Sequence, residues 1–223
     1  FTFTSGSSDT LLVSPFGQDN CSLDSLYLNQ SSFSCQDTGT HAILLSAEDQ
    51  SSNVTTDTTF VTILDTISPE LATQPLTVYL DSNGTTDITA ADLDNGTTSN
   101  CALDTIEVSK DQFGCVDVGS QIVQITAKDV NGNATSDSVP ITVVDSLAPT
   151  LLVRNLSLVL GPTGTVNIDS ADVDNGSFDN CGIASLSINP NQLDTSNYGN
   201  NAVVITLTDV NGNVTQRTIT VNI

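Results

Sequence analysis

The chain has 223 residues, of which 38% are hydrophobic and 4% aromatic, and it contains no Trp and no Met. Acidic residues outnumber basic ones 26 to 4, for a formal net charge of -22, so the chain should repel nucleic acid and anionic membranes and attract cations. The sequence has no run of about 18 apolar residues, the length that would predict a membrane-spanning segment. The chain begins at Phe1 without a signal segment, which favours a processed protein or a window of a longer one.

Three copies of one repeat follow each other at a constant spacing in the sequence. Two sets of landmarks share this spacing: Cys21, Cys101 and Cys181, and Asp49, Asp129 and Asp209. A fixed period of this kind indicates a tandem array. The linkers Asp65-Thr-Ile-Ser-Pro69 and Asp145-Ser-Leu-Ala-Pro149 place the boundaries near 67 and 147. We therefore expect a first repeat at 1–67, a second at 68–147 and a third at 148–223.

Each repeat carries apolar residues with a period of two, the pattern of a half-buried strand. The alternating residues are Ile43, Leu45 and Ala47, then Val123, Ile125 and Ala127, then Val203, Ile205 and Leu207. An Asn-Gly turn follows in the second and third repeats, and another alternating run comes after it. Asn-Gly between such runs predicts a hairpin with a type I′ turn, which needs positive φ at both central residues. Short strands in repeats of this length predict an all-β chain of three tandem immunoglobulin-like β-sandwich domains.

The repeats also carry matching polar motifs. These are Ala-Asp-Leu-Asp-Asn-Gly at 91–96, Ala-Asp-Val-Asp-Asn-Gly at 171–176, an Asn-Cys pair in every repeat, and Asp-Val-Asn-Gly-Asn at 129–133 and 209–213. In these motifs the whole chain resembles the Ig-like, HYR-like tandem repeats of bacterial surface proteins and adhesins, especially those of Bacteroidetes. The resemblance implies a stalk or an adhesive module.

The first repeat lacks the opening segment that the other two carry before their strands at 76–80 and 156–160. Its Phe1-Thr-Phe3-Thr start already corresponds to the later strand, so we expect an exposed sheet edge. Two interpretations follow. The chain is a window of a long repeat stalk, or it is a filament subunit whose first repeat is completed by a strand from a neighbour.

The cysteine spacing predicts local disulfides. Cys21 and Cys35 have the same separation as Cys101 and Cys115, which favours one bridge in each of the first two repeats and an oxidising compartment. A zinc site is the alternative, but the chain has a single His, His41. The third repeat has Thr195 at the second position, so Cys181 is predicted to be a free thiol, either buried or available for an intermolecular bridge.

The acidic turns predict calcium sites at the two boundaries between repeats. In an immunoglobulin-type sandwich these turns should meet the preceding linker, and calcium prefers carboxylate and amide oxygens. The predicted ligands are Asp65, Asp92, Asp94, Asp129 and Asn131 at the first boundary, and Asp145, Asp172, Asp174, Asp209 and Asn211 at the second. The alternative is structural, because Asp and Asn before Gly also form tight turns by bonding nearby backbone amides.

Two glycosylation patterns occur. Asn-x-Thr sequons stand at the same place in all three repeats, at Asn53, Asn133 and Asn213. A second pattern, Asp followed by Ser or Thr and a small or aliphatic residue, resembles the O-glycosylation signal of Bacteroidetes surface proteins. It occurs at Thr10, Ser25, Thr58, Thr66, Thr105, Ser138, Ser146 and Ser170.

Catalysis is not expected, because the single His41 has no counterpart in the other repeats and acidic motifs repeated in tandem indicate structure. The sequence therefore predicts a non-enzymatic, extracellular structural protein, a segment or subunit of a glycosylated surface filament or adhesin stalk. Its partners would be further copies or repeats, covalent glycans and calcium, with no nucleic acid and no membrane insertion. The alternative is an array of calcium-dependent adhesive or carbohydrate-binding modules attached to a larger secreted protein.

Overall fold

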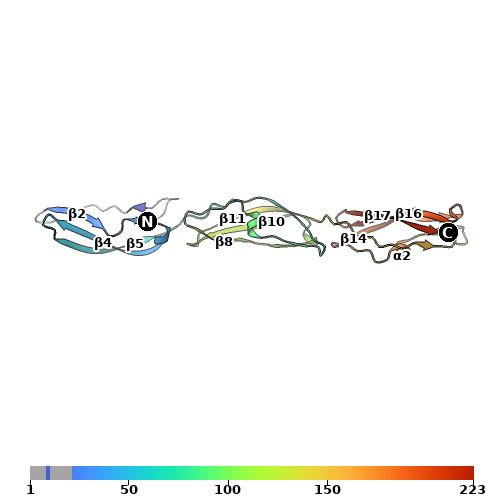
Figure 1. Cartoon of the computed structure of the whole chain (residues 1–223), viewed down its shortest axis with the longest axis horizontal. Coiled ribbons are helices and arrows are strands. Elements are labelled where there is room, and N and C mark those ends of the chain that lie inside the picture. Colours follow the sequence, from blue (N-terminus) through green and yellow to red (C-terminus); the bar gives the residue numbers. More distant parts are fainter. Residues whose placement is uncertain (1–8, 11–21) are drawn as a thin grey trace. The chain divides into compact units, whose positions relative to one another are not determined.

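The structure is a computed structural model that describes the backbone of residues 9–10 and 22–223, with side chains from residue 22 onward. The described residues form two compact units. Figure 1 shows that strands make up most of the regular structure. The first unit comprises the described part of Phe1–Pro75, Thr89–Ser109 and Val123–Val139, and the second comprises Leu76–Ile88, Lys110–Ile122 and Pro140–Ile223. The second sequence repeat contributes residues to both units. Among the described residues, no helix is long and apolar enough to cross a membrane.

Strands dominate every repeat. The first contains β1 (Asp9–Thr10), β2 (Leu23–Leu28), β3 (Ser32–Phe33), the 3-10 turn η1 (Cys35–Asp37), β4 (Gly39–Asp49) and β5 (Val54–Ile63). The second contains β6 (Leu76–Tyr79), β7 (Thr85–Asp87), α1 (Ala90–Leu93), β8 (Leu103–Val108), β9 (Gln112–Gly114), η2 (Cys115–Asp117), β10 (Gly119–Asp129) and β11 (Ala134–Val144). The third contains β12 (Leu156–Ser157), β13 (Thr165–Asn167), α2 (Ser170–Val173), β14 (Ile183–Asn189), β15 (Gln192–Asp194), η3 (Thr195–Asn197), β16 (Asn200–Asp209) and β17 (Val214–Asn222).

The strands pair in the same way in the second and third repeats, and the first repeat shares this pattern except for one edge strand. A larger sheet has the order β2-β4-β5 in the first repeat, β6-β11-β10-β8 in the second and β12-β17-β16-β14 in the third. Smaller two-stranded sheets are β1-β3, β7-β9 and β13-β15. The central hairpins are antiparallel, whereas β6 pairs with β11 and β12 with β17 in parallel. The chain is thus mostly β, with tandem sandwich-like domains, which confirms the predicted fold class.

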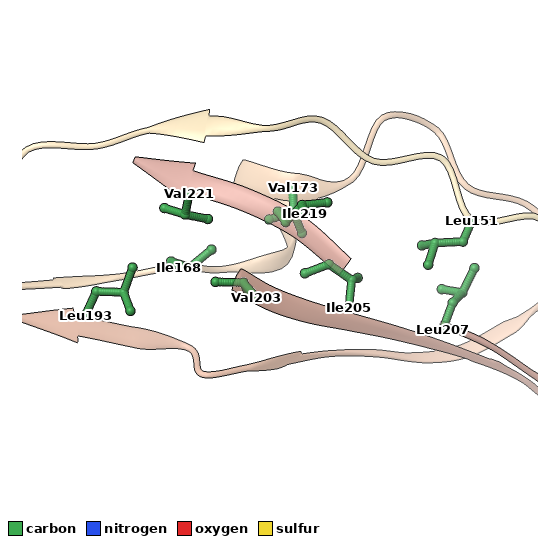
Figure 2. Packing of buried hydrophobic residues seen from close by; sticks show 9 residues of the cluster. All are labelled: Leu151, Ile168, Val173, Leu193, Val203, Ile205, Leu207, Ile219 and Val221. Atoms are coloured by element: carbon green, nitrogen blue, oxygen red, sulfur yellow. The ribbon is translucent and has the colours of Figure 1, made fainter. Parts of the chain in front are cut away.

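Aliphatic side chains form the core, as the alternating pattern predicts. In the third repeat nine buried Val, Leu and Ile side chains pack together: Leu151, Ile168, Val173, Leu193, Val203, Ile205, Leu207, Ile219 and Val221. Figure 2 shows those of β16 and β17 converging with those of Ile168, Val173 and Leu193. In the first repeat the buried cluster consists of Phe33, Ile43 and Ile63. The cores are small, so covalent and polar links should contribute much of the stability.

The first repeat differs at one sheet edge. Within the described residues β5 is the last strand of its sheet, whereas the corresponding β11 and β17 are covered by β6 and β12. Phe60 of β5 is 71% exposed. The Phe1-Thr-Phe3-Thr segment, on which the expectation of a missing strand rests, lies outside the described residues.

The Asn-Gly turns form hairpins, but the predicted type I′ geometry is wrong. Asp129 N–H donates to the Asn133 carbonyl (3.0 Å), and of the turn residues only Gly132 has a positive φ, +88°. This is the pattern of a three-residue loop in which a left-handed residue follows a type I turn. In the first repeat Ser52, with φ of +63°, takes the place of Gly132.

Candidate functional site at the junctions between repeats

Two disulfides join consecutive repeats. Cys35 is bonded to Cys101 and Cys115 to Cys181, each across a sequence separation of 66. The predicted local pairs Cys21–Cys35 and Cys101–Cys115 are therefore wrong, and Cys181 is not a free thiol. Cys21 itself lies outside the described residues.

Strand length explains why the local pairs fail. A strand of six or seven residues, such as β8 or β14, separates the two cysteine positions of a repeat, and such a strand extends about 20 Å. The bonded cysteines have Cα atoms only 5.2 and 5.3 Å apart. Cysteines on either side of a strand in one repeat are thus placed to meet the neighbouring repeats.

The backbone approaches closely at these bridges. The Cys35 sulfur lies 3.5 Å from the Asn100 carbonyl oxygen, and the Cys115 sulfur lies 3.4 Å from the corresponding oxygen of Asn180. At the second bridge a Cβ on Gly84 would come within 2.6 Å of the Cys115 sulfur and 2.8 Å of the Asn180 oxygen. Gly84 has φ of +75°, so both its conformation and the space around it require glycine.

Asp65 organises the first junction from the linker. The residue is 9% exposed, and its carboxylate accepts hydrogen bonds from the side-chain amides of Asn100 (2.9 Å) and Asn131 (3.0 Å), one on each oxygen. Its carbonyl accepts from Asn133 Nδ2 (3.2 Å). Asn133 in turn donates to Asp129, so the linker is tied to the β10–β11 turn.

Asp145 occupies the same place in the second junction but is bonded less completely. Its Oδ1 accepts from Asn180 Nδ2 (3.2 Å), and its carbonyl accepts from Asn213 Nδ2 (3.2 Å). In the described structure Asn211 makes no hydrogen bond corresponding to the Asn131–Asp65 bond. Asp145 is 6% exposed, and its Oδ2 has no hydrogen-bond partner.

A group of three carboxylates lies at this second junction. One oxygen each of Asp145, Asp179 and Asp209 lies within 4.8 Å of the others, the one such group of acidic, His or Cys residues within the described ranges. Asp209 is 1% exposed and accepts from the backbone N–H of Asn211 and Asn213. Asp179 accepts from the N–H of Cys181 (2.8 Å) and Gly182 (3.0 Å). Two full charges about 5 Å apart repel by about 3 kcal/mol at an effective dielectric constant of about 20.

Among the residues that the structure describes, no basic side chain neutralises this group. Lys110 pairs with Asp117, Lys128 with Glu107, and Arg154 donates to the carbonyls of Ala171 and Asp172. Arg217, the remaining basic residue of the chain, forms no ion pair in the described structure and lies in β17, paired with Ile205. The group therefore has the character of a cation site.

Unpartnered buried oxygens mark the same places. Within residues 22–223, five buried side-chain atoms lack a hydrogen-bond partner, and all five are oxygens at the two junctions. They are Ser99 Oγ and Asn100 Oδ1 at the first junction, and Asp145 Oδ2, Asn180 Oδ1 and Asn211 Oδ1 at the second. Buried polar atoms are nearly always satisfied in native proteins, so a cluster of unmet acceptors points to a missing donor or ion.

Asp65 at the first junction and Asp209 at the second have lowered pKa values. Burial is the largest influence on Asp65 and by itself raises the pKa, but hydrogen bonds from Asn100, Ile67 and Asn131 outweigh it and hold the pKa below its usual value. The pKa of Asp209 is lowered in the same way, with burial opposed by bonds from Asn213 and Asn211. Charged oxygens are thus available to a cation near neutral pH.

The predicted ligand set is divided by the structure. Asp65, Asp129 and Asn131 meet at the first junction, and Asp145 and Asp209 at the second, beside the turn that carries Asn211. The other four predicted ligands are used in local caps and turns. Asp92 and Asp172 accept backbone bonds at the starts of α1 and α2, and Asp94 and Asp174 accept from Thr97 and Ser177.

None of those four carboxylates belongs to the close group of three, so the expectation that they converge on the linkers is not met. Sequence reasoning missed Asp179, Asn100 and Asn180. The Asn-Cys pairs were an available signal, since an Asn that precedes an inter-repeat bridge must lie at the junction.

The sequons differ in accessibility. Asn133 donates both Nδ2 hydrogens, to Asp65 and Asp129, and Asn213 does the same to Asp145 and Asp209. A glycan on either would displace one of these bonds, which disfavours modification there. Asn53 is exposed, and so are Thr58, Thr66, Ser138, Ser146 and Ser170, whereas Ser25 and Thr105 are half-buried. The side chain of Thr10 lies outside the described set.

No protein-family model matches the chain, and no curated protein does either. Several solved cadherin structures are similar to it. Human CDH23 EC21-23 has 15% identity and a TM-score of 0.36, over 82% of this chain and 74% of that one. Mouse clustered PcdhgC3 EC1-3 has 14% identity and a TM-score of 0.31, over 87% of this chain and 81% of that one. Protocadherin Gamma B7 extracellular cadherin domains 1-4 have 16% identity and a TM-score of 0.29, over 91% of this chain and 67% of that one. TM-scores this low carry no argument about binding or activity.

Proposed function

We propose that this chain is an extracellular structural protein, a segment of a surface stalk or filament in which neighbouring repeats are locked together. The observation that carries the proposal is the pair of disulfides, each of which joins one repeat to the next rather than closing a repeat on itself. Disulfides persist in oxidising, extracellular compartments. Each bridge closes a loop across a sequence separation of 66, which the chain-entropy model values at about 4 kcal/mol.

A comparison with a variant that lacks both disulfides tests this role. Amide hydrogen exchange of the linkers 65–69 and 145–149 is measured on the oxidised chain and on a Cys35→Ser, Cys101→Ser, Cys115→Ser, Cys181→Ser variant. If the bridges fix the junctions, the linker amides of the variant exchange at least tenfold faster while the β16 and β17 amides keep their protection. Equal linker exchange in the two proteins would contradict the proposed role.

Calcium is the second component of the proposal. The junction oxygens are carboxylates and amide carbonyls, the ligands that calcium takes. Bound calcium would fix the Asp145 carboxylate against the β16–β17 turn and so stiffen the second junction. We further propose that the domain boundaries lie near 67 and 147. We also propose that the exposed Ser and Thr sites carry O-linked glycans.

Self-association is the third component. A pocket of about 200 Å³ in the third repeat is lined by Leu158, Val159, Leu160, Tyr198 and Ile223. Val159 is 87% exposed and Tyr198 72%. Leu160 and Ile223 are half-buried, whereas Leu80 and Val143, at the same positions in the second repeat, are buried. Apolar surface of this kind favours a protein partner, for which we propose a second copy. We also propose that a neighbouring copy adds a strand to the first repeat beside the exposed β5.

Sedimentation of the wild-type chain and a Val159→Asp variant tests the association. We expect a concentration-dependent dimer or larger species that the variant loses, whereas a monomer at all concentrations would contradict self-association. The competing function, an array of calcium-dependent adhesive or carbohydrate-binding modules, predicts binding to a glycan array.

A further inference from the structure

We propose that the second junction holds one calcium ion, bound by Asp145, Asp179 and Asp209 together with the side-chain oxygens of Asn180 and Asn211. The first junction is a counterpart without an ion, in which hydrogen bonds satisfy both oxygens of the linker carboxylate. This inference rests on the proposed function but is more specific. It adds Asp179 to the ligand set and makes the two junctions unequal.

The spacing of the carboxylates fits calcium. Three oxygens that lie within 4.8 Å of one another can all bind a common ion at 2.3–2.6 Å, because ligands on opposite sides of calcium are about 5 Å apart. Magnesium binds at about 2.0–2.1 Å, which would bring opposite ligands to about 4 Å. The donors are all oxygen, and the nearby sulfurs are held in a disulfide, so zinc has no suitable ligand set.

The unpartnered oxygens supply independent support. Asp145 is nine-tenths buried and belongs to the group of three, yet its Oδ2 has no hydrogen-bond donor. Asn180 and Asn211, from the two turns that meet Asp145, each keep a buried Oδ1 without a donor as well. A buried carboxylate oxygen costs free energy unless a donor or a cation meets it. A single ion explains why one oxygen of this group of three carboxylates and two neighbouring amide oxygens have no donor.

The first junction shows what replaces the ion. Ser99 stands at the position of Asp179, so this junction has one carboxylate fewer. The Asn131 amide donates to Asp65 Oδ2 at 3.0 Å, satisfying the oxygen whose counterpart on Asp145 is free. Asn131 and Asn211 are the same residue type at the same place in the repeat. One substitution, Asp for Ser, therefore distinguishes a junction whose linker carboxylate is satisfied by an amide from one whose linker carboxylate would be satisfied by calcium.

Titration of the oxidised, full chain with Ca²⁺ tests the proposal, using isothermal calorimetry and displacement of luminescent Tb³⁺. We expect one site in the wild type. Asp179→Ser, which recreates the first junction, should weaken it at least 100-fold, and Ser99→Asp should raise the stoichiometry to two. Asp104→Ser is the matched control, because it removes one exposed carboxylate that makes no hydrogen bond or ion pair in the described structure, and it should leave the affinity within twofold.

Several results would overturn the inference. It is contradicted if the wild type has two equal sites or binds no calcium at all. It is also contradicted if Asp179→Ser binds calcium like the wild type, or if Ser99→Asp still binds one ion. Ser99→Asp keeps the test valid if Asp179→Ser misfolds, since Asp179 also accepts two backbone bonds. The linker exchange experiment fails or succeeds separately, so an absent ion would leave the disulfide-linked structural role standing.

Discussion

The two junctions share their covalent and backbone-directed links and differ in their charge. In both, a cystine spans a sequence separation of 66, an Asn side chain holds the linker carbonyl at 3.2 Å, and a Thr hydroxyl donates at 2.7 Å to the linker Pro carbonyl, Thr135 to Pro69 and Thr215 to Pro149. The difference lies in Ser99 and Asp179. The comparison teaches that hydrogen bonds to the backbone hold each linker against the next repeat. A single side chain, Ser99 or Asp179, determines whether the junction needs a cation.

The largest expected effect comes from the shared part. Replacing Cys35 and Cys101 by Ser, or Cys115 and Cys181, should each lower the free energy of unfolding by about 4 kcal/mol, because both bridges close loops of equal length. Denaturant unfolding of the two double variants measures this. The two bridges are not equivalent if one double variant loses less than half as much free energy of unfolding as the other.

Calcium removal should separate the junctions. A ligand at 100 times its dissociation constant stabilises by about 2.7 kcal/mol, so saturating Ca²⁺ should raise the melting temperature of the wild type by several degrees. The melting temperature of Asp179→Ser should not respond to chelator. A chelator response of equal size in both proteins would place the ion elsewhere.

Two glycines sharpen the comparison of the repeats themselves. Gly84 and Gly164 stand one period apart with φ of +75° and +77°, but a Cβ at Gly164 meets only the Thr195 methyl, at 3.6 Å. Both Ala substitutions carry the same backbone strain, of about 1 kcal/mol. Gly84→Ala should cost about 1–2 kcal/mol more, from overpacking against the bridge. If thermal unfolding shows the same loss of stability in Gly84→Ala and Gly164→Ala, the backbone does not approach the bridge closely at Gly84.

The smallest effect should appear in acid. Because Asp65 and Asp209 have lowered pKa values in the folded chain, the stability they contribute is present above the unfolded value of about 3.9 and is lost as pH falls through the folded values. Unfolding between pH 6 and 3 should therefore show a decline that begins below about pH 5. Asp65→Asn and Asp209→Asn should flatten it, and an unchanged slope in both variants would argue against the assigned pKa directions.

Much of the fold follows from the sequence, because strand patterning is local. Val203, Ile205 and Leu207 alternate in the sequence and are buried in the structure. Asn133 and Asn213 of the hairpin turns donate to the carbonyls of Asp65 and Asp145, because a strand that ends in a Pro linker brings its last residues to the next repeat. Cysteine pairing failed for the opposite reason. The equal spacing of cysteines in two repeats does not show that a strand lies between Cys101 and Cys115.

The ligand set illustrates a second limit. Asp92 and Asp172 look like repeated ligands, but at the third position of a short helix such a carboxylate bonds the backbone at the helix start. Asp179 has a counterpart in the first repeat, Asp19, but not in the second, where Ser99 stands, so a search for ligands shared by both junctions misses it. The residue that differs between repeats was the informative one.

Disulfide mapping tests the central claim most directly. Complete cleavage after Lys110, Lys128, Arg154 and Arg217, without reduction, places Cys115 in fragment 111–128 and Cys181 in fragment 155–217, with the other cysteines in 1–110. Bridges between repeats predict a mass for 111–128 joined to 155–217, which reduction separates. A mass for 111–128 joined to 1–110, with 155–217 free, would show local bridges and contradict the account.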